Sequence, residues 1–538
     1  MAVSRPSPRG ADLVVDALVG AGVRQLFTLS GNQILPIYDA TVGRDIALIH
    51  TRHEAAAVHM ADGWGRLTEE PGVALVTAGP GHLNAVSALY TALGSQSPVV
   101  LLSGHAPRGL LGRGAFQEVD QVMAARPVVK AAWLAERAEA LGQDMARALA
   151  LARAWPPGPV HVSLPGDLLE ARVTASAPAR IPSASATPVP ERSVSAALEL
   201  LAGARRPLII VGPAMGRAGR WAGVMRLAEI TGIPALLMES PRGVNDPALR
   251  AAGTALSHAD VVLLLGKRLD FTLRFGQPPA FTADCRFVHA DLDAVPPAGR
   301  VAFALAGEPR AVAHQLAEAA ARRPWQRSAW VKEIESARRA TPPDWEALAR
   351  ASTRPMHPLR LCAALQPLVE RSLLVADGGE FGQWCQAGLE PALRLINGPS
   401  GSIGSALPMA LGARLARPDL PVLAVLGDGT FGFHALELDT AVRHRIPVVA
   451  VVGNDARWNA EYQLQRQHYG TERAVGCELL PTRYDRLAEA LGAHGEHVEA
   501  PDDLGPALVR AVASGRPACV NVVIDGAAAP AFARGATH

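Results

Sequence analysis

Short apolar runs alternate with longer amphipathic segments along almost the whole chain. The amphipathic segments predict helices, for example at 12–21 and 54–67. The strands predicted from the apolar runs are 46–50, 72–77, 99–103, 207–211, 261–265, 286–290, 372–376, 422–426, 448–452 and 518–524. Strands that alternate with helices in this way are typical of βαβ units and of mostly parallel sheets. The predicted fold class is therefore α/β.

Two stretches interrupt this alternation. Residues 171–190 are mainly Ala, Ser, Pro and Thr, which is the composition of an extended connector, and residues 322–358 are charged and punctuated by prolines. A chain of 538 residues is also too long for one hydrophobic core. We expect three doubly wound parallel-sheet domains, at 1–175, 190–340 and 355–538.

Composition and charge argue against several classes of protein. Hydrophobic residues make up 49% of the chain and charged residues 19%, which argues against disorder. The net charge of +2 leaves no basic field for nucleic acid. The first ten residues lack an apolar signal core, and no uncharged apolar run reaches membrane-spanning length. The five cysteines show no CxxC spacing, which disfavours zinc sites and disulfides. These features predict an intracellular, cytoplasmic protein with no membrane partner.

Acidic turns follow two successive predicted strands of the last third. The run 421–426 ends in Gly427-Asp428-Gly429-Thr430, and the run 448–452 ends in Gly453-Asn454-Asp455. Between them, a single amphipathic helix is predicted at 431–443. Because parallel strands end at one edge of a sheet, Asp428 and Asp455 are expected to converge on one ion. Two carboxylates and nearby carbonyls suit Mg²⁺, and Gly427 and Gly429 allow phosphates to approach the backbone. An isolated Gly-Asp-Gly is more often a tight turn, but the second acidic turn favours a diphosphate–metal site.

This pattern resembles the motif of thiamine diphosphate enzymes, in which a Gly-Asp-Gly precedes an Asn pair; here Asp455 replaces the second Asn. The first third adds Gly31, His59-Met60-Ala61-Asp62-Gly63, residues 78–84 and residues 115–118. Together these resemble the acetolactate synthase-like group, which includes acetohydroxyacid synthase, benzaldehyde lyase, oxalyl-CoA decarboxylase and 2-hydroxyacyl-CoA lyase. The resemblance covers nearly the whole chain and implies pyrimidine-binding, central and diphosphate-binding domains, with thiamine diphosphate and Mg²⁺ as cofactors.

The resemblance assigns roles by position. Glu54, at a strand–helix junction, would activate the cofactor, although a Glu in a first helical turn also has a modest favourable interaction with the helix dipole. Gln117 and Lys130 are the other predicted catalytic residues. The predicted cofactor-binding positions are Gly31, Glu54, Pro80, Asn84, Gly379, Glu380, Phe381, Gly401, Ile403, Gly427, Asp428, Gly429, Thr430 and Asp455. The predicted metal positions are Asp428, Asp455 and Arg457. The predicted substrate pocket comprises Asn32, Gln33, Phe116, Gln117, Trp458 and Glu461.

Departures from the group bear on the substrate. The glycine turn 212–216 lacks a full GxGxxG, which weakens the signal for a dinucleotide site. Residues 266–276 look more like a segment of the CoA-handling lyases than like the Arg-Phe-Asp-Asp-Arg-like string of family members that carry FAD, which makes FAD doubtful. In this segment Arg268 and Arg274 are available for phosphate groups. Leu464 falls where biosynthetic acetohydroxyacid synthases have a Trp, and Gln33 where benzaldehyde lyase has a catalytic His.

These features predict a thiamine diphosphate- and Mg²⁺-dependent enzyme that makes or breaks a C–C bond next to a carbonyl, acting on 2-oxoacids. A 2-hydroxyacyl-CoA lyase or acyl-CoA decarboxylase is the alternative within enzymes, and a catalytically silent cofactor-binding regulatory subunit is the alternative outside them. The expected partners are a small 2-oxoacid, aldehyde or acyl-CoA. The resemblance also implies a homodimer or homotetramer with the cofactor at the subunit interface.

Overall fold

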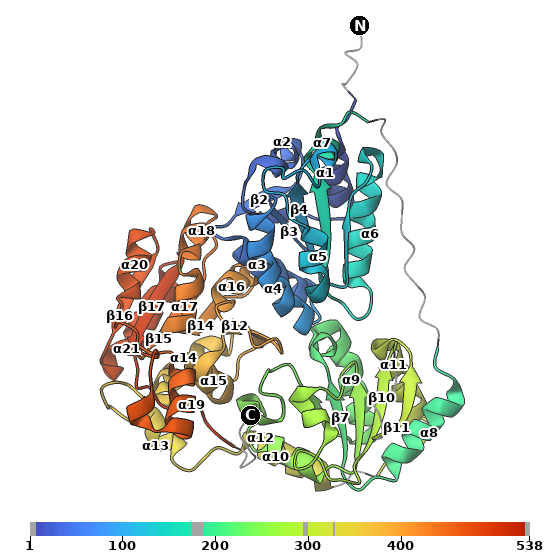
Figure 1. The fold of residues 1–538 in the computed structure, drawn as a ribbon. Coiled ribbons are helices and arrows are strands. Elements are labelled where there is room, and N and C mark those ends of the chain that lie inside the picture. Colours follow the sequence, from blue (N-terminus) through green and yellow to red (C-terminus); the bar gives the residue numbers. More distant parts are fainter. Residues whose placement is uncertain (1–6, 174–187, 294–299, 327–328, 533–538) are drawn as a thin grey trace.

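The computed structural model describes residues 7–173, 188–293, 300–326 and 329–532, and every structural statement below concerns these residues. They form three parallel sheets with helices around them, which confirms the predicted α/β class (Figure 1). The N-terminal and C-terminal sheets have six strands each, and the central sheet has five. Most of the predicted connector at 171–190 lies outside the described residues, so the domain boundaries stay predictions.

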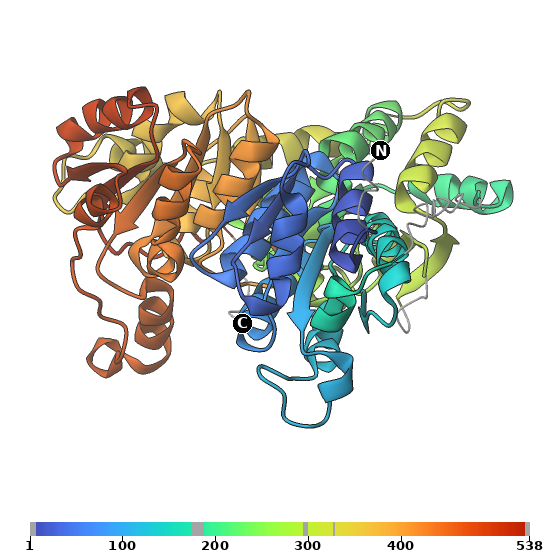
Figure 2. The ribbon, with the colours of Figure 1, turned by 90° about the horizontal axis from the view of Figure 1, so that it is seen from above.

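The N-terminal sheet has the strand order β2-β1-β3-β4-β6-β5, and β3, β4 and β6 are buried along their whole length. The strands are β1 Gln25–Thr28, β2 Ala47–His50, β3 Gly72–Val76, β4 Val99–His105, β5 Ala131–Leu134 and β6 Val160–Pro165. The helices are α1 Gly10–Gly20, α2 Leu35–Thr41, α3 Glu54–Thr68, α4 Pro80–Gly94, α5 Gln121–Ala125, α6 Leu141–Arg153 and α7 Gly166–Glu170. The loop between β4 and α5, in light blue, projects from the body of the molecule (Figure 2).

The central sheet has the order β11-β10-β9-β7-β8. Its strands are β7 Pro207–Val211, β8 Ala235–Leu237, β9 Val261–Leu265, β10 Arg286–Asp291 and β11 Val301–Ala306. Its helices are α8 Glu191–Ala202, α9 Ala218–Thr231, α10 Ala252–Ala255, α11 Pro309–Ala320 and α12 Ala329–Arg339. The order reverses between β7 and β9, because β8 lies on one side of β7 while β9 to β11 extend the sheet on the other.

The C-terminal sheet repeats the N-terminal topology with the order β13-β12-β14-β15-β17-β16. Its strands are β12 Leu373–Ala376, β13 Leu393–Ile396, β14 Val422–Gly427, β15 Val449–Asn454, β16 His494–Val498 and β17 Ala518–Val523. Its helices are α13 Trp345–Arg350, α14 Pro358–Val369, α15 Gly379–Gly388, α16 Ala406–Ala416, α17 Asp428–His434, α18 Glu437–Arg443, α19 Asn459–Tyr469, α20 Tyr484–Ala490 and α21 Pro501–Ala513.

Helices α3 and α16 join the N-terminal and C-terminal domains (Figure 1). A Cβ atom on Gly63 would lie 2.4 Å from the Met409 carbonyl oxygen, and one on Gly412 would lie 2.0 Å from that of Met60. The two backbones can approach this closely only because both helices carry glycine at the contact. One apolar core, which includes Met60 and Met409, therefore runs from one domain into the other.

Three other expectations can be compared with the structure. The single helix expected at 431–443 is wrong, because the described chain forms α17 and α18 with a break at Ala435 and Leu436. All five cysteines are buried and free. Among the described helices, none combines the length and apolar character needed to cross a bilayer.

Candidate active site

Two aspartates meet at the carboxyl edge of the C-terminal sheet. Strands β14 and β15 are neighbours, with Gly427 opposite Gly453, so Asp428 and Asp455 leave the sheet side by side. Asp428 is buried, and its Oδ2 has no hydrogen-bond partner among the described residues. Burial raises the pKa of Asp428, and burial together with the Asp428 charge raises the pKa of Asp455. Such a pair of like charges suits a hard divalent cation.

The loop after β15 is held by Asn454. Its Nδ2 donates to the Thr482 carbonyl at 2.9 Å and to Oδ1 of Asn521 at 3.1 Å, and its Oδ1 accepts from the Ala456 amide. The Arg457 guanidinium lies 4.6 Å from the centre of the Tyr462 ring. A guanidinium is also no metal ligand, so only the backbone carbonyl of Arg457 could serve the predicted metal site.

Trp458 lies against the Gly-Asp-Gly turn. A Cβ on Gly429 would stand 2.7 Å from Cζ3 of Trp458, and the indole meets the Phe433 ring edge to face at 6.1 Å. Gly429 therefore lets the indole pack directly on the backbone next to Asp428.

Asp377 organises a second pair of loops at the same edge. Its buried carboxylate accepts hydrogen bonds from the backbone amides of Gly378 at 2.8 Å and of Gly404 and Ala406 at 3.0 Å each. Burial raises the pKa of Asp377 to about 6. Gly379 has a φ of 82° and a Cβ there would meet nothing within 4 Å, so the start of α15 faces open space. This open glycine turn fits a diphosphate group that approaches backbone amides.

The other predicted residues of these loops have mixed surroundings. Ile403 is half-buried and packs on Gly378, whereas Gly401 is exposed with a φ of 71°. The Phe381 ring lies in the core beside Gly453, so only its backbone is available to a ligand. Glu380 accepts a hydrogen bond from the Ala529 amide at 2.7 Å, and burial raises its pKa.

Glu54 is the first residue of α3 and is buried. Its Oε2 accepts a hydrogen bond from Nδ2 of Asn84 at 3.1 Å, and its Oε1 would lie 3.3 Å from a Cβ on Gly81. Both neighbours belong to the first turns of α4, which begins at Pro80. The structure thus brings Glu54 and Asn84 together at the start of α4, and the cofactor-activating role of Glu54 stays a prediction.

The remaining N-terminal residues of the prediction gather around β3 and β4. Oε1 of Gln33 accepts from the Thr77 hydroxyl at 2.6 Å, and Gly31 packs on the Thr77 side chain. A Cβ on Gly79 would lie 2.6 Å from the carbonyl oxygen of Gln117. Asn32 begins a short helical turn next to Gln33.

Of the other predicted residues, Lys130 has its contacts away from these groups. Nζ of Lys130 donates to the carbonyls of Leu151 and Ala154 at 2.6 Å each, at the end of α6, and burial lowers its pKa to about 8. These contacts give Lys130 a helix-capping role. Phe116, Glu461 and Arg268 are exposed. The catalytic and pocket roles of these residues stay predictions.

Two residues that link the C-terminal domain to the segment before Glu54 were not predicted. The Glu437 carboxylate accepts hydrogen bonds from the backbone amides of Arg52, at 3.1 Å, and His53, at 3.0 Å, immediately before Glu54. His434 shares a hydrogen bond of 2.7 Å with the Gly404 carbonyl and meets the His53 ring at 5.8 Å. Both follow the Gly-Asp-Gly turn, where the pattern predicts only an ordinary amphipathic helix.

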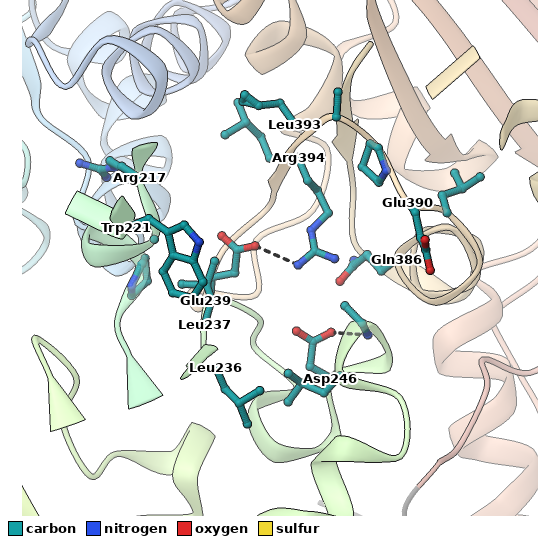
Figure 3. Close-up of a pocket in the computed structure, with 18 of the residues that line it drawn as sticks. Arg217, Trp221, Leu236, Leu237, Glu239, Asp246, Gln386, Glu390, Leu393 and Arg394 are labelled. Carbon is teal, nitrogen blue, oxygen red and sulfur yellow. Dashed lines mark hydrogen bonds and ion pairs between the residues drawn. The ribbon is translucent and has the colours of Figure 1, made fainter. Parts of the chain in front are cut away.

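Two cavities open between domains. One of about 560 Å³ is lined by Glu380, Gln383, Leu464, Arg242, Arg274 and Phe271, among others. A larger one of about 870 Å³ lies among all three domains, and Figure 3 shows Arg394 and Glu239 facing each other across it. Their ion pair measures 3.1 Å. None of the predicted site residues lines the larger cavity, whereas Glu380 lines the smaller one.

The chain matches three family models that together cover most of its length. These are the N-terminal TPP binding domain of thiamine pyrophosphate enzymes at residues 8–124, their central domain at 194–316 and their C-terminal TPP binding domain at 377–522. Each match falls on one of the three sheets, although the first ends before β5 and β6 and the last begins just after β12.

Curated relatives match over nearly the whole chain. A probable acetolactate synthase of Mycobacterium bovis is 38% identical over 530 residues, covering 95% of each chain. 2-Hydroxyacyl-CoA lyase 2 of Homo sapiens is 33% identical over 536 residues, covering 90% of this chain and 84% of the human one. A probable acetolactate synthase large subunit of Methanocaldococcus jannaschii is 28% identical, covering 97% and 93%. The chain therefore belongs to the acetolactate synthase-like group of the thiamine pyrophosphate enzyme family and is a thiamine diphosphate-dependent enzyme.

Proposed function

We propose that this enzyme binds thiamine diphosphate with Mg²⁺ and decarboxylates a 2-oxoacid, transferring the remaining fragment to a carbonyl acceptor. The observation that carries the proposal is the pair of buried Asp428 and half-buried Asp455, in which one carboxylate oxygen of Asp428 has no partner among the described residues. The 38% identity to a probable acetolactate synthase supports the 2-oxoacid as substrate class.

Thiamine diphosphate, when bound, supplies a nucleophilic carbon and an electron sink for C–C bond cleavage. In our proposal Asp428, Asp455 and the Arg457 carbonyl hold Mg²⁺, and the open turn at Gly379 receives the diphosphate. Glu54 holds a proton at the aminopyrimidine ring, and Asn84 orients the Glu54 carboxyl through its 3.1 Å hydrogen bond. The half-buried side chains of Ile403 and Trp458 exclude water from the reacting atoms.

We further propose a homodimer, or a tetramer built from it, with the cofactor between subunits. Helix α4 begins beside Glu54, yet Leu83 and Tyr90 on its outer face are 48% and 49% exposed. Phe116, on the loop that carries Gln117, is 71% exposed. Large apolar side chains around a candidate active site are typical of a surface that a second subunit covers. Light scattering at several concentrations tests this, and Leu83→Glu should shift the enzyme toward the monomer.

A 2-hydroxyacyl-CoA lyase is the second candidate. The cavity of about 560 Å³ combines Arg242 and Arg274 with Phe271 and Phe275 beside Glu380, which suits phosphates and an adenine ring. The human relative at 33% identity bears the name of such a lyase. Arg268 is exposed and does not line this cavity, so Arg274 is the stronger phosphate candidate.

The deciding experiment compares turnover of pyruvate, with and without an aldehyde acceptor, with turnover of a 2-hydroxyacyl-CoA. Glu54→Gln should lower kcat by about 10²- to 10⁴-fold while thiamine diphosphate still binds, and Glu191→Gln, at an exposed position on α8, is the matched control. Acyloin formed from pyruvate supports our proposal, and aldehyde release from the CoA substrate alone supports the lyase. Full activity of Glu54→Gln contradicts the role of Glu54, and an inactive wild type favours the silent subunit.

A further inference from the structure

The central sheet has a crevice of the kind that binds ligands in other doubly wound sheets. Its strand order reverses between β7 and β9, and ligands of open α/β sheets bind outside the carboxyl ends of the strands at such a switch point. Gly212 follows β7, Gly266 follows β9, and Asp291 ends β10. A glycine turn, a helix N-terminus and an acidic residue at a strand end are the parts that recognise a nucleotide in such sheets.

Trp155 of the N-terminal domain fills this crevice. Its indole packs on Gly266 so closely that a Cβ there would lie 2.5 Å from Cζ2 of the ring. Its Nε1 donates to Oδ1 of Asp291 at 2.7 Å. In nucleotide-binding sheets an acidic side chain near this edge accepts a ribose hydroxyl. Here the Asp291 carboxylate is occupied by the indole.

The glycine turn and the helix N-terminus are occupied in the same way. The Ala214 amide donates to Oε1 of Gln96 at 3.1 Å. At the start of α9 the Gly219 amide donates to Oε1 of Glu69 at 3.2 Å, while Oε2 of Glu69 pairs with Nη1 of Arg220 at 2.5 Å. The Glu69 carboxylate thus stands where a ligand phosphate would meet a helix N-terminus.

All three side chains come from one end of the N-terminal domain. The loops that follow α3, α4 and α6 carry Glu69, Gln96 and Trp155, respectively. The C-terminal ends of these helices face the central domain (Figure 1). Arg217 adds a contact in the opposite direction, because its Nη2 donates to the carbonyls of Ser95 at 3.0 Å and Gln96 at 2.6 Å. In Figure 3, Arg217 lies at the wall of the large cavity nearest the N-terminal domain.

We propose that the N-terminal domain docks into the crevice of the central domain in which a nucleotide would otherwise bind. The side chains of the N-terminal domain that take the positions of a nucleotide's phosphate and ribose are Glu69, Gln96 and Trp155. The central domain of this enzyme therefore takes neither FAD nor ADP at this edge. Its role is to hold the N-terminal domain in a fixed orientation. This inference is independent of the substrate proposed above.

Equilibrium dialysis of the thiamine diphosphate- and Mg²⁺-loaded enzyme against ADP and against FAD tests whether the crevice of the central domain excludes nucleotides. We expect no saturable binding tighter than about 1 mM. Saturable binding that slows amide hydrogen exchange at residues 212–221 would overturn the proposal. Saturable binding that leaves hydrogen exchange at residues 212–221 unchanged would show that the nucleotide binds elsewhere on the enzyme, which supports a closed crevice.

A double-mutant cycle tests the docking contact itself. Trp155→Phe removes the indole N–H, and Asp291→Ala removes the oxygen that accepts from it, so the loss in Tm from the first should largely disappear in the presence of the second. Trp133→Phe is the matched control, because Nε1 of Trp133 donates to Asp144 at 2.9 Å within the N-terminal domain. Its effect should add to that of Asp291→Ala. Additive effects of Trp155→Phe and Asp291→Ala would show that the contact does not hold the domains.

Discussion

Asp428 and Asp455 leave the ends of adjacent parallel strands side by side, and burial together with the Asp428 charge raises the pKa of Asp455. Neither carboxyl group faces a cationic side chain at ion-pair distance among the described residues. Two like charges that are largely withdrawn from water are costly unless a proton or a metal ion lies between them. This relationship is the physical basis of the Mg²⁺ site that we propose.

Asp455→Asn keeps an oxygen ligand but removes one negative charge next to the proposed cation. We expect the Mg²⁺ concentration for half-maximal activity to rise on the order of 10-fold, because the electrostatic attraction weakens. The control is Asp419→Asn, which alters a carboxylate that pairs with Arg417 on the surface before β14. An unchanged Mg²⁺ requirement in Asp455→Asn would contradict the assignment of Asp455 as a ligand.

Gly429→Ala places a methyl group 2.7 Å from the Trp458 ring, so the indole must move. We expect a loss of about 1–3 kcal/mol in the free energy of unfolding and a higher thiamine diphosphate requirement. Gly432→Ala, in the same helix, meets nothing within 4 Å. It should be neutral or stabilise the protein by up to about 1 kcal/mol. Chemical denaturation of both variants checks the pair, and equal effects would rule out the packing argument.

Asp377→Asn removes an acceptor oxygen from a carboxylate that receives three backbone amides. At least one amide then faces an NH₂ group, at a cost of about 1–3 kcal/mol. Because these amides belong to two loops of the proposed cofactor site, we expect a lower Tm together with weaker cofactor binding. Thermal unfolding with and without thiamine diphosphate measures both effects. Asp344→Asn, at an exposed position, is the control, and a Tm equal to wild type in Asp377→Asn would refute the prediction.

His82 should limit stability in mild acid. Burial lowers its pKa to about 4, and its ring lies 4.4 Å from that of His161, whose pKa is also lowered. The unfolded chain therefore binds protons at His82 below pH 6.5 while the folded chain does not, so stability falls as the pH drops from 6.5 to about 4. The loss from His82 alone is about 3 kcal/mol.

The measurement is the Tm as a function of pH for wild type and His82→Gln. The variant lacks the titrating group, so its Tm should fall less steeply between pH 6.5 and about 4. His314→Gln, on the exposed face of α11, should leave the slope unchanged. A slope in His82→Gln as steep as that of wild type would show that His82 is not responsible.

Local sequence carried most of the fold prediction, because strand and helix periodicity depend on near neighbours. The strands absent from the prediction have three to six residues; they are β1, β5, β6, β8, β11, β13 and β16. With three residues, β8 is too short for a pattern of its own. Neither Ala435 nor Leu436 is a proline or a glycine, so the residue types there do not predict the break between α17 and α18.

The sequence by itself determined the α/β class, the convergence of Asp428 and Asp455, and the position of Glu54 at the start of a helix. Each of these follows from the order of residues along one strand–turn–helix unit. Only the tertiary structure decided that Asp377 ties two loops together, that Glu437 holds the amides before Glu54, and that Trp155 fills the central crevice. These contacts join residues far apart in the chain, and no local pattern specifies which distant partner a buried polar group will find.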